Sequence, residues 1–271
     1  MELSTLQYEK RDGAAIITLN RPERHNAING AMSRELPRVW DDVKRDPAVV
    51  VAIVTGAGPR ALCTGMDVAD IASGTAQVGE AAERGSMQSI RLTALQTGCF
   101  KPVITAVNGM VCGGGLHFVA DSDIVICSEN ATFFDTHVNV GLLGVYEPIG
   151  LTRRIPFEAV MRLSLAGSGD RMDAKRALDI GLVSEVTPQD GLLPRALELA
   201  REIMRNSPAA LVATKRAIWE SLNLSLDAAL EHGWSAIEQH AGHPDIQEGA
   251  RAFAEKRAPS WQGVSLEDTS R

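Results

Sequence analysis

Apolar residues in the first half of this chain gather in short continuous runs between glycine- and proline-containing turns, a pattern typical of buried strands. Leu6–Asn20 holds two such runs around Asp12-Gly13, a dipeptide that favours a hairpin turn. Val49–Val54 and Ile124–Cys127 predict further buried strands. Helical spacing over Ala31–Arg45 predicts a helix that follows the hairpin.

The second half differs, because its apolar residues follow helical spacing from Pro148 onward. Asp173 is placed to cap a short helix that Gly181 ends, after which Leu182–Val186 returns as a strand. Longer helices are expected at about Leu192–Asn206, Pro208–Leu222, Leu226–His240 and Asp245–Glu255. This half is therefore predicted to be mainly helical.

The order of elements favours a particular fold class. Val68–Thr97 has weak periodicity and predicts a short helix, a loop and a helix from about Ala81 to Gln96. Elsewhere, strand–strand–helix is commoner than strict strand–helix alternation, which indicates an α/β fold of layered sheets wound as a superhelix. A large domain with a smaller end fits 271 residues of 45% apolar content. We place the core in residues 1–200 and a helical region in residues 201–271.

Composition excludes some functions. The net charge of −7 and the pI near 5.4 argue against non-specific nucleic-acid binding. The first residues, MELSTLQYEKRDG, are acidic and lack an apolar segment, so no signal peptide is expected. The 4 cysteines stand singly, which predicts reduced, buried thiols and a cytoplasmic protein. A catalytic thiol at Cys63 or Cys112 is the alternative.

The most informative stretch is Lys101–Asp123, KPVITAVNGMVCGGGLHFVADSD. A strand-like run turns at Asn108-Gly109, reaches the triplet Gly113–Gly115 and leaves from Leu116 at helical spacing. The first N–H groups of a helix have no partner within it, and glycine lets a ligand approach them closely. The stretch therefore predicts a backbone site for an oxyanion or a phosphate.

A membrane helix or a nucleotide-binding motif fits this stretch less well. Pro102–Ala120 has no formal charge, but its proline, glycines and histidine make a poor membrane helix. A dinucleotide fingerprint fails because Phe118 stands where the third glycine is required, and no Lys-Ser or Lys-Thr follows the glycines as in a phosphate loop. A purely structural turn remains open on these residues alone.

Several motifs, taken together and in this order, resemble the crotonase superfamily, also called the enoyl-CoA hydratase/isomerase family. They are RPERHNAIN, CTGMDV, KPVITAVNGMVCGGG, DSDIVICSENATF, GDRMDAKRALDIGLVSEVTP and EGARAFAEKRAPSWQG, spread over about residues 10–263. The resemblance implies a ClpP/crotonase-like fold of repeated ββα units. It also implies that residues 201–271 form a trimerisation region in a homotrimer or homohexamer.

The resemblance further implies an acyl-CoA thioester substrate whose enolate is stabilised in an oxyanion hole. By motif position, the two donors are the backbone N–H groups of Met66 and Gly114, with Gly113 beside them. Coenzyme A enters as part of the substrate, so no separate cofactor is implied. The other positions that the resemblance assigns to substrate or CoA binding are Arg24, Thr64, Val68, Tyr146, Glu147 and Lys256, the last on the same or a neighbouring subunit.

The chain departs from the family pattern at the acid/base positions. Hydratases of this family carry two glutamates, and the corresponding residues here are His117 and His137. Because histidine titrates near pH 6.5, one neutral ring can act as base and one protonated ring as acid, and two close rings would share a proton. A space-filling role is the alternative. A metal site using Asp135 as well lacks further ligands, and none is expected.

We therefore predict an enzyme that hydrates or dehydrates an enoyl-CoA, with His117 and His137 in the acid/base roles. Isomerisation, hydrolysis or decarboxylation of a CoA thioester, using Glu147 or Tyr146, is the second hypothesis. The third is a non-catalytic acyl-CoA binding protein. No nucleic acid and no membrane is expected among the partners.

Overall fold

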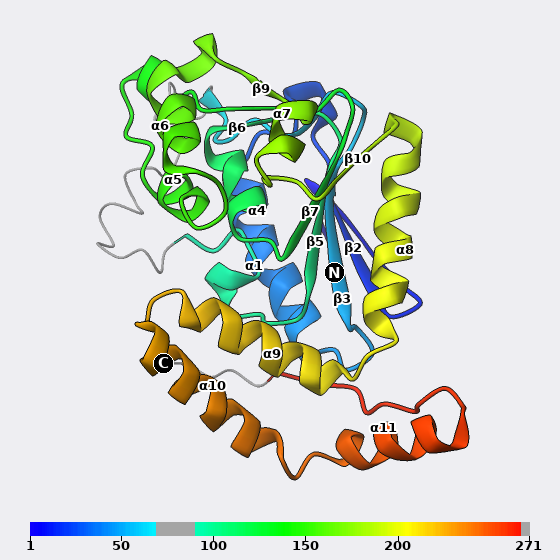
Figure 1. Cartoon of the computed structure of the whole chain (residues 1–271). Coiled ribbons are helices and arrows are strands. Elements are labelled where there is room, and N and C mark those ends of the chain that lie inside the picture. Colours follow the sequence, from blue (N-terminus) through cyan, green and yellow to red (C-terminus); the bar gives the residue numbers. More distant parts are fainter. Residues whose placement is uncertain (69–89, 267–271) are drawn as a thin grey trace.

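The computed structural model of the chain describes residues 1–68 and 90–266, and its body is built on two sheets (Figure 1). In the larger, 6-stranded sheet, β1 is antiparallel to its neighbour and the remaining strands are parallel. Its strands in spatial order are β1 (Leu6–Arg11), β2 (Ala14–Leu19), β3 (Val51–Gly56), β5 (Val103–Val107), β7 (Ile124–Ser128) and β10 (Glu185–Thr187).

The smaller sheet has 4 short strands in the order β4 (Ala61–Cys63), β6 (Met110–Cys112), β8 (Thr132–Phe134) and β9 (Met172–Asp173). The first three strands of this sheet each follow a strand of the larger sheet along the chain, so that β3 leads to β4, β5 to β6 and β7 to β8. Successive turns stack in parallel in both sheets. The predicted superhelix of ββα units is therefore confirmed.

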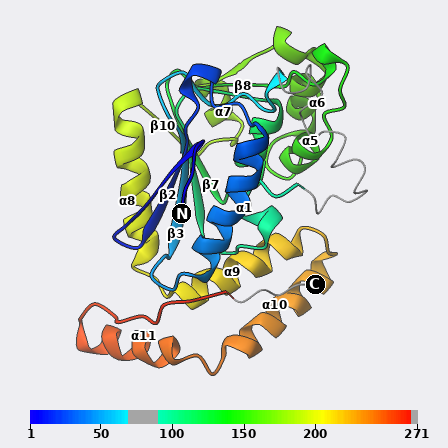
Figure 2. The same ribbon diagram turned by 180° about the vertical axis from the view of Figure 1, so that it is seen from behind.

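The central strands are apolar throughout because helices cover both faces of the larger sheet. Ile53, Ile104 and Ile126 pack with α8 (Leu192–Met204) on one face. Intervening residues of the same strands belong to the main core with α1 (Gly30–Arg45) on the other face. The two helices lie on opposite sides of the sheet in both ribbon views (Figures 1 and 2).

The remaining helices mostly agree with the prediction. They are α4 (His117–Ala120), α5 (Tyr146–Leu151), α6 (Phe157–Ala166), α7 (Ala174–Asp179), α9 (Pro208–Ser221), α10 (Leu226–His240) and α11 (Pro244–Glu255). Asp173 caps α7 as expected, since its side chain accepts a hydrogen bond from the Arg176 N–H at 2.8 Å. The long C-terminal helices begin and end within two residues of the predicted limits.

Part of the predicted helix Ala81–Gln96 is wrong, and the rest lies outside the described residues. Residues 90–94 are not helical, and only a 3₁₀ turn, η3 (Leu95–Thr97), follows them. Side chains take the backbone groups that a helix would need, because Leu92 donates its N–H to Gln96 Oε1 and accepts from Trp40 Nε1. The strand predicted at Leu182–Val186 likewise starts later, at Glu185.

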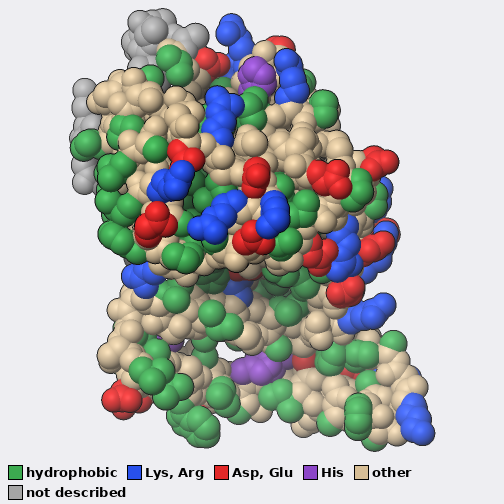
Figure 3. All heavy atoms as spheres, turned by 45° about the horizontal axis from the view of Figure 1, so that its top comes forward, with side chains coloured by type: hydrophobic (Ala, Val, Ile, Leu, Met, Phe, Trp, Pro, Cys, Tyr) green, Lys and Arg blue, Asp and Glu red, His purple; other side chains and the backbone are tan. Residues whose placement is uncertain are grey.

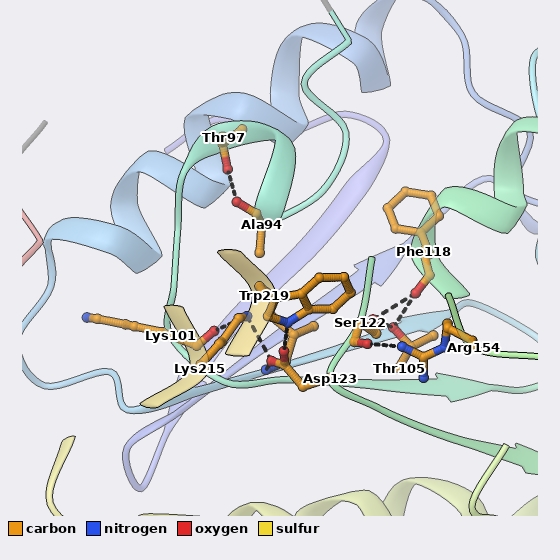
Figure 4. Close-up of polar contacts among 11 residues, drawn as sticks. Ala94, Thr97, Lys101, Thr105, Phe118, Ser122, Asp123, Arg154, Lys215 and Trp219 are labelled. Atoms are coloured by element: carbon orange, nitrogen blue, oxygen red, sulfur yellow. Dashed lines mark hydrogen bonds and ion pairs between the residues drawn. The ribbon is translucent and has the colours of Figure 1, made fainter. Parts of the chain in front are cut away.

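Helix α9 is fastened to the sheet by a polar cluster at Asp123 (Figure 4). The Asp123 carboxylate accepts from Trp219 Nε1 at 2.7 Å and pairs with Lys215 Nζ at 2.8 Å. Lys215 Nζ also donates to the Lys101 carbonyl at 2.9 Å.

Helices α9–α11 form a layer beside the body, and hydrophobic side chains gather on this layer at the bottom of Figure 3. The domain division at residue 200 stays a prediction.

Candidate active site

The loop after β4 presents the backbone N–H of Met66. Ile28 bridges this loop by donating its N–H to the Gly65 carbonyl at 2.8 Å and accepting from the Asp67 N–H at 2.9 Å. Arg21 holds the loop from outside through a 2.9 Å ion pair with Asp67. Because a parallel bridge uses the groups on either side of Met66, the Met66 N–H is directed away from Ile28.

The glycine triplet brings a second N–H to the same place. It forms a 3₁₀ turn, η4 (Gly113–Leu116), whose first N–H groups have no partner within the turn. A Cβ on Gly65, whose φ is +82°, would lie 2.9 Å from the Gly114 nitrogen, so only glycine allows this approach. A Cβ on Gly114 would lie 3.7 Å from the Met66 nitrogen. The two predicted donors are therefore neighbours.

A buried carboxylate lies beside these two donors. Glu147, in the first turn of α5, places Oε1 3.8 Å from the position of a Cβ on Gly114. The same oxygen lies 3.2 Å from His117 Nε2, and both side chains are only 7% exposed. Glu147 and His117 thus form a pair shielded from water.

The second ring nitrogen of His117 also has a partner. Gln96 Nε2 lies 3.0 Å from His117 Nδ1. Gln96 belongs to η3, which precedes β5. The sequence analysis missed this residue because no sequence pattern links Gln96 to His117. The ring is therefore held from both sides.

His137 has a separate carboxylate. Its Nδ1 lies 2.6 Å from Asp135 Oδ1, and its backbone N–H donates to the same oxygen at 3.0 Å. The hydrogen bond to Asp135 raises the pKa of His137 above 6.5, although burial opposes this. Burial would raise the pKa of Asp135, but the hydrogen bonds from His137 hold it below 3.8. The His137 ring lies near the glycine triplet, since its Cε1 is 3.7 Å from the position that a Cβ on Gly113 would take.

The two histidines were expected to share a proton if their rings were close. The structure instead gives each ring its own partner, Glu147 for His117 and Asp135 for His137. The site thus contains two histidine–carboxylate pairs beside two neighbouring backbone N–H groups.

Comparison with known proteins identifies the family. The model of the enoyl-CoA hydratase/isomerase family matches residues 9–264 of this chain. The chain belongs to this family. Its membership in the crotonase superfamily, expected from the motifs, is thus confirmed.

Relatives in the enoyl-CoA hydratase/isomerase family align over almost the whole chain. (E)-benzylidenesuccinyl-CoA hydratase of Thauera aromatica is 34% identical over 264 residues, covering 94% of this chain and 98% of that protein. Carnitinyl-CoA dehydratase of Proteus mirabilis (strain HI4320) is 33% identical, covering 96% and 98%. The crystal structure of an enoyl-CoA hydratase/isomerase from Mycobacterium paratuberculosis matches with a TM-score of 0.86 at 38% identity, covering 96% and 98%. The crotonase fold is confirmed as well.

Most residues that the family resemblance assigned to CoA lie near Met66. Thr64 donates its hydroxyl to the His25 carbonyl at 3.3 Å, which places it beside Arg24 in the preceding loop. Arg24 is exposed, and Val68 is 60% exposed. Arg24 and Val68 are therefore open to solvent on segments that adjoin the Met66 loop.

Two further predicted residues differ from these in exposure or in position. Tyr146 is 45% exposed, whereas Glu147 next to it is buried. Lys256 follows α11, which lies at the lower end of the molecule in Figure 1, well apart from α4 and α5. The structure therefore does not bring Lys256 to the site of its own chain.

The thiol alternative is not supported by the surroundings of the cysteines. Burial raises the pKa of Cys63 to about 12 and that of Cys112 to about 11, so both are protonated at neutral pH. In residues 1–68 and 90–266, no group of three or more His, Cys, Asp or Glu side chains could hold a metal ion. No helix in the same part of the chain is long and apolar enough to cross a membrane.

Proposed function

We propose that this member of the enoyl-CoA hydratase/isomerase family hydrates the double bond of an enoyl-CoA thioester and catalyses the reverse dehydration. The observation that carries the proposal is the pair of histidine–carboxylate units beside the N–H groups of Met66 and Gly114. One unit is His117 with Glu147, and the other is His137 with Asp135. Hydratase names among relatives over 30% identical support it.

The Met66 and Gly114 N–H groups donate to the thioester carbonyl oxygen. Negative charge collects on this oxygen when a nucleophile adds to the β-carbon, and each donor of this kind contributes about 3 kcal/mol in the transition state. Because backbone supplies both donors, the methionine side chain at position 66 does not interfere with them. The proposed hole thus stabilises the enolate formed in either direction of the reaction.

The two histidine–carboxylate units divide the proton transfers. The His117–Glu147 unit takes a proton from water, whose oxygen bonds to the β-carbon while the C=C electrons move toward the thioester oxygen. Protonated His137, favoured by Asp135, donates the proton on its Nε2 to the α-carbon. One water is added, and the protons re-equilibrate with solvent.

A spectrophotometric assay tests the proposal. A panel of enoyl-CoA thioesters is followed by loss of the conjugated enoyl absorbance from about pH 5 to 9, with identification of a 3-hydroxyacyl-CoA product. Loss of absorbance with that product is expected for at least one substrate. Measurable binding of CoA esters without turnover of any of them would favour the acyl-CoA binding protein instead.

Glu147 supports a second candidate, a CoA-thioester isomerase, hydrolase or decarboxylase. Its buried carboxylate lies next to Gly114, where a single base can remove and return a proton α to the thioester. A product with a shifted double bond, free CoA or released CO₂ would favour this candidate over hydration. Tyr146, which the same hypothesis named, is half-exposed beside it.

For partners, the family implies an acyl-CoA, and we propose that CoA enters only as part of the substrate, without a separate cofactor. We also propose a cytoplasmic homotrimer or homohexamer assembled through residues 201–271. Support comes from a row of large apolar side chains exposed on one face of α10, which a neighbouring subunit would cover. Lys256, remote from its own site, would then reach a neighbour's CoA.

A further inference from the structure

The amide of Gln96 has a fixed orientation. The Leu92 backbone N–H, which can only donate, lies 2.8 Å from Gln96 Oε1. The amide nitrogen Nε2 must therefore be the group that faces His117, 3.0 Å from Nδ1. Since Gln96 Nε2 can only donate, His117 Nδ1 accepts and carries no proton.

The proton of the neutral His117 ring then has one place left, Nε2. That nitrogen lies 3.2 Å from Glu147 Oε1, which is an ion-pair contact. An ionised carboxylate can only accept, so a proton on Nε2 also suits this contact, whereas a bare Nε2 would turn a lone pair toward the carboxylate. A ring whose two nitrogens are occupied in this way has no free lone pair with which to remove a proton from water.

We propose that Gln96 is a positioning residue that holds His117 as the neutral Nε2–H tautomer, so that Glu147 is the proton acceptor of the pair. His117 orients this carboxylate and stabilises its charge. The catalytic part of this inference rests on the proposed function, whereas the tautomer stands on the hydrogen bonds alone.

In the described part of the chain, the other charged groups near His117 do not bind its ring nitrogens. Asp121, one turn along from His117, is occupied by the Thr93 hydroxyl at 2.7 Å, and burial raises its pKa. The Arg154 charge acts against this rise in the pKa of Asp121, and the Glu147 charge helps to raise the pKa of His137. Only Gln96 and Glu147 are within hydrogen-bond distance of the ring among the described residues.

The tautomer is measured by ¹⁵N NMR of full-length protein labelled at its histidine ring nitrogens, without substrate. His117 is identified as the signal set missing from His117→Gln. At about pH 7.5 we expect His117 Nδ1 as an unprotonated nitrogen and Nε2 as a protonated one, because the Gln96 amide offers Nδ1 a donor and no acceptor. A protonated Nδ1 in the wild type would overturn the proposal.

Gln96→Glu tests the role of the amide. Its carboxylate still accepts from Leu92 but now demands a proton on His117 Nδ1, which gives an imidazolium between two acceptors. The titration midpoint of His117 should rise by about one pH unit or more, since opposite charges favour the charged ring. Gln7→Glu, which adds the same charge on the exposed strand β1, is the matched control and should leave His117 unchanged.

Gln96→Met separates positioning from packing. It keeps the length of the side chain and removes both hydrogen bonds, so Glu147 alone is left to bias the ring. The Nε2–H tautomer should lose part of its population, while the histidines other than His117 keep their signals. An unchanged His117 spectrum in both Gln96 variants would also overturn the proposal. In the hydration assay, Gln96→Glu should move the acidic limb of kcat/KM to lower pH, because an imidazolium favours ionised Glu147. If the protein shows no hydratase activity, the proposed function fails, but the NMR experiment still decides the tautomer of His117 because it needs no substrate.

Discussion

Asp135 and His137 hold each other across a two-residue step at the end of β8, because both the ring Nδ1 and the backbone N–H of His137 meet the same carboxylate oxygen. The carboxylate is 1% exposed and the ring 17% exposed. A carboxylate that accepts from a residue two positions along closes a tight local turn. His137 is thus oriented by its own loop, with Nε2 directed away from Asp135.

Asp135→Asn should change the pH dependence of turnover. The amide removes the negative charge that raises the pKa of His137, so this pKa should fall toward its ordinary value. If protonated His137 is the acid, the alkaline limb of kcat/KM for hydration moves to lower pH. An alkaline limb unmoved by the substitution contradicts the assignment. Thr136→Ser, which leaves both partners in place, is the control.

The same pair makes stability depend on pH. His137 has a folded pKa above 6.5, so its contribution is complete below pH 6.5 and is lost as pH rises through the folded value. Asp135 has a folded pKa below 3.8, so its contribution is complete above pH 3.8 and is lost as pH falls through the folded value. Urea unfolding should show wild type more stable than His137→Gln by about 2 kcal/mol between these limits, and by less at alkaline pH.

Adjacent glycines of the triplet should respond differently to alanine. A Cβ on Gly115 would lie 2.4 Å from the Cys63 carbonyl oxygen, so Gly115→Ala should cost about 1–3 kcal/mol in the free energy of unfolding. Among the described residues, a Cβ on Gly114 meets nothing closer than 3.6 Å, but it stands between Met66 and Glu147. Gly114→Ala should therefore keep its stability and lose about 10²-fold in kcat/KM. Equal losses of stability would show that the space beside Gly114 is structural only.

Glu147→Gln isolates the role of the buried carboxylate. The amide keeps the shape and can still accept from His117 Nε2, so thermal unfolding should change little. Loss of the proton acceptor should reduce turnover by about 10²–10⁴-fold. Tyr146→Phe is the matched control on the half-exposed neighbour, and it should keep turnover. Retained activity in Glu147→Gln, or its loss in Tyr146→Phe, argues for a different base.

A glycine triplet before a helix predicted backbone N–H groups at this place, and the family resemblance supplied Met66 and Gly114 as the pair that the structure shows to be neighbours. The partners of the histidines could not be predicted. Gln96 and Glu147 lie far from His117 along the chain, and no periodicity reports a contact between segments that meet only in the folded superhelix. The sequence suggested Asp135 only as a metal ligand, although its spacing from His137 allowed a local hydrogen bond.

The strands of the larger sheet were predictable for a related reason. Val103–Val107 and Ile124–Ser128 are buried on both faces, and continuous apolar runs mark them. Strands β4 and β6 were missed because 3 residues beside glycines are too few for a pattern. They are nevertheless the strands that lead into the Met66 loop and the triplet, so the site sits on the least predictable elements.

Removing the carboxylate that fastens α9 should weaken the protein strongly. Asp123→Ala leaves Lys215, whose side chain is 6% exposed, without its charged partner, which should cost about 3–5 kcal/mol. Urea unfolding measures this cost, and hydrogen exchange in α9 locates it. Asp179→Ala, which breaks an exposed ion pair with Lys175, is the control and should barely change stability. Adding Lys215→Met to Asp123→Ala should recover part of the lost stability. If the losses from the two single substitutions simply add in the double variant, the Asp123–Lys215 pair does not fasten α9.

The exposed face of α10 should govern assembly. Leu226, Leu230, Trp234 and Ile237 follow helical spacing and are 74%, 65%, 61% and 60% exposed in one chain.

Replacing Leu230 by Glu puts a charge in the middle of this row without touching the core, so the single chain should fold normally. If a second copy covers the row, desolvating that charge disfavours association. Size-exclusion chromatography with light scattering should then give a smaller mass for Leu230→Glu than for wild type, with matching circular dichroism. Glu231→Gln, at an exposed neighbouring position, should keep the wild-type mass. A monomeric wild type, or an unchanged mass in Leu230→Glu, would show that α10 is not the contact that joins the subunits.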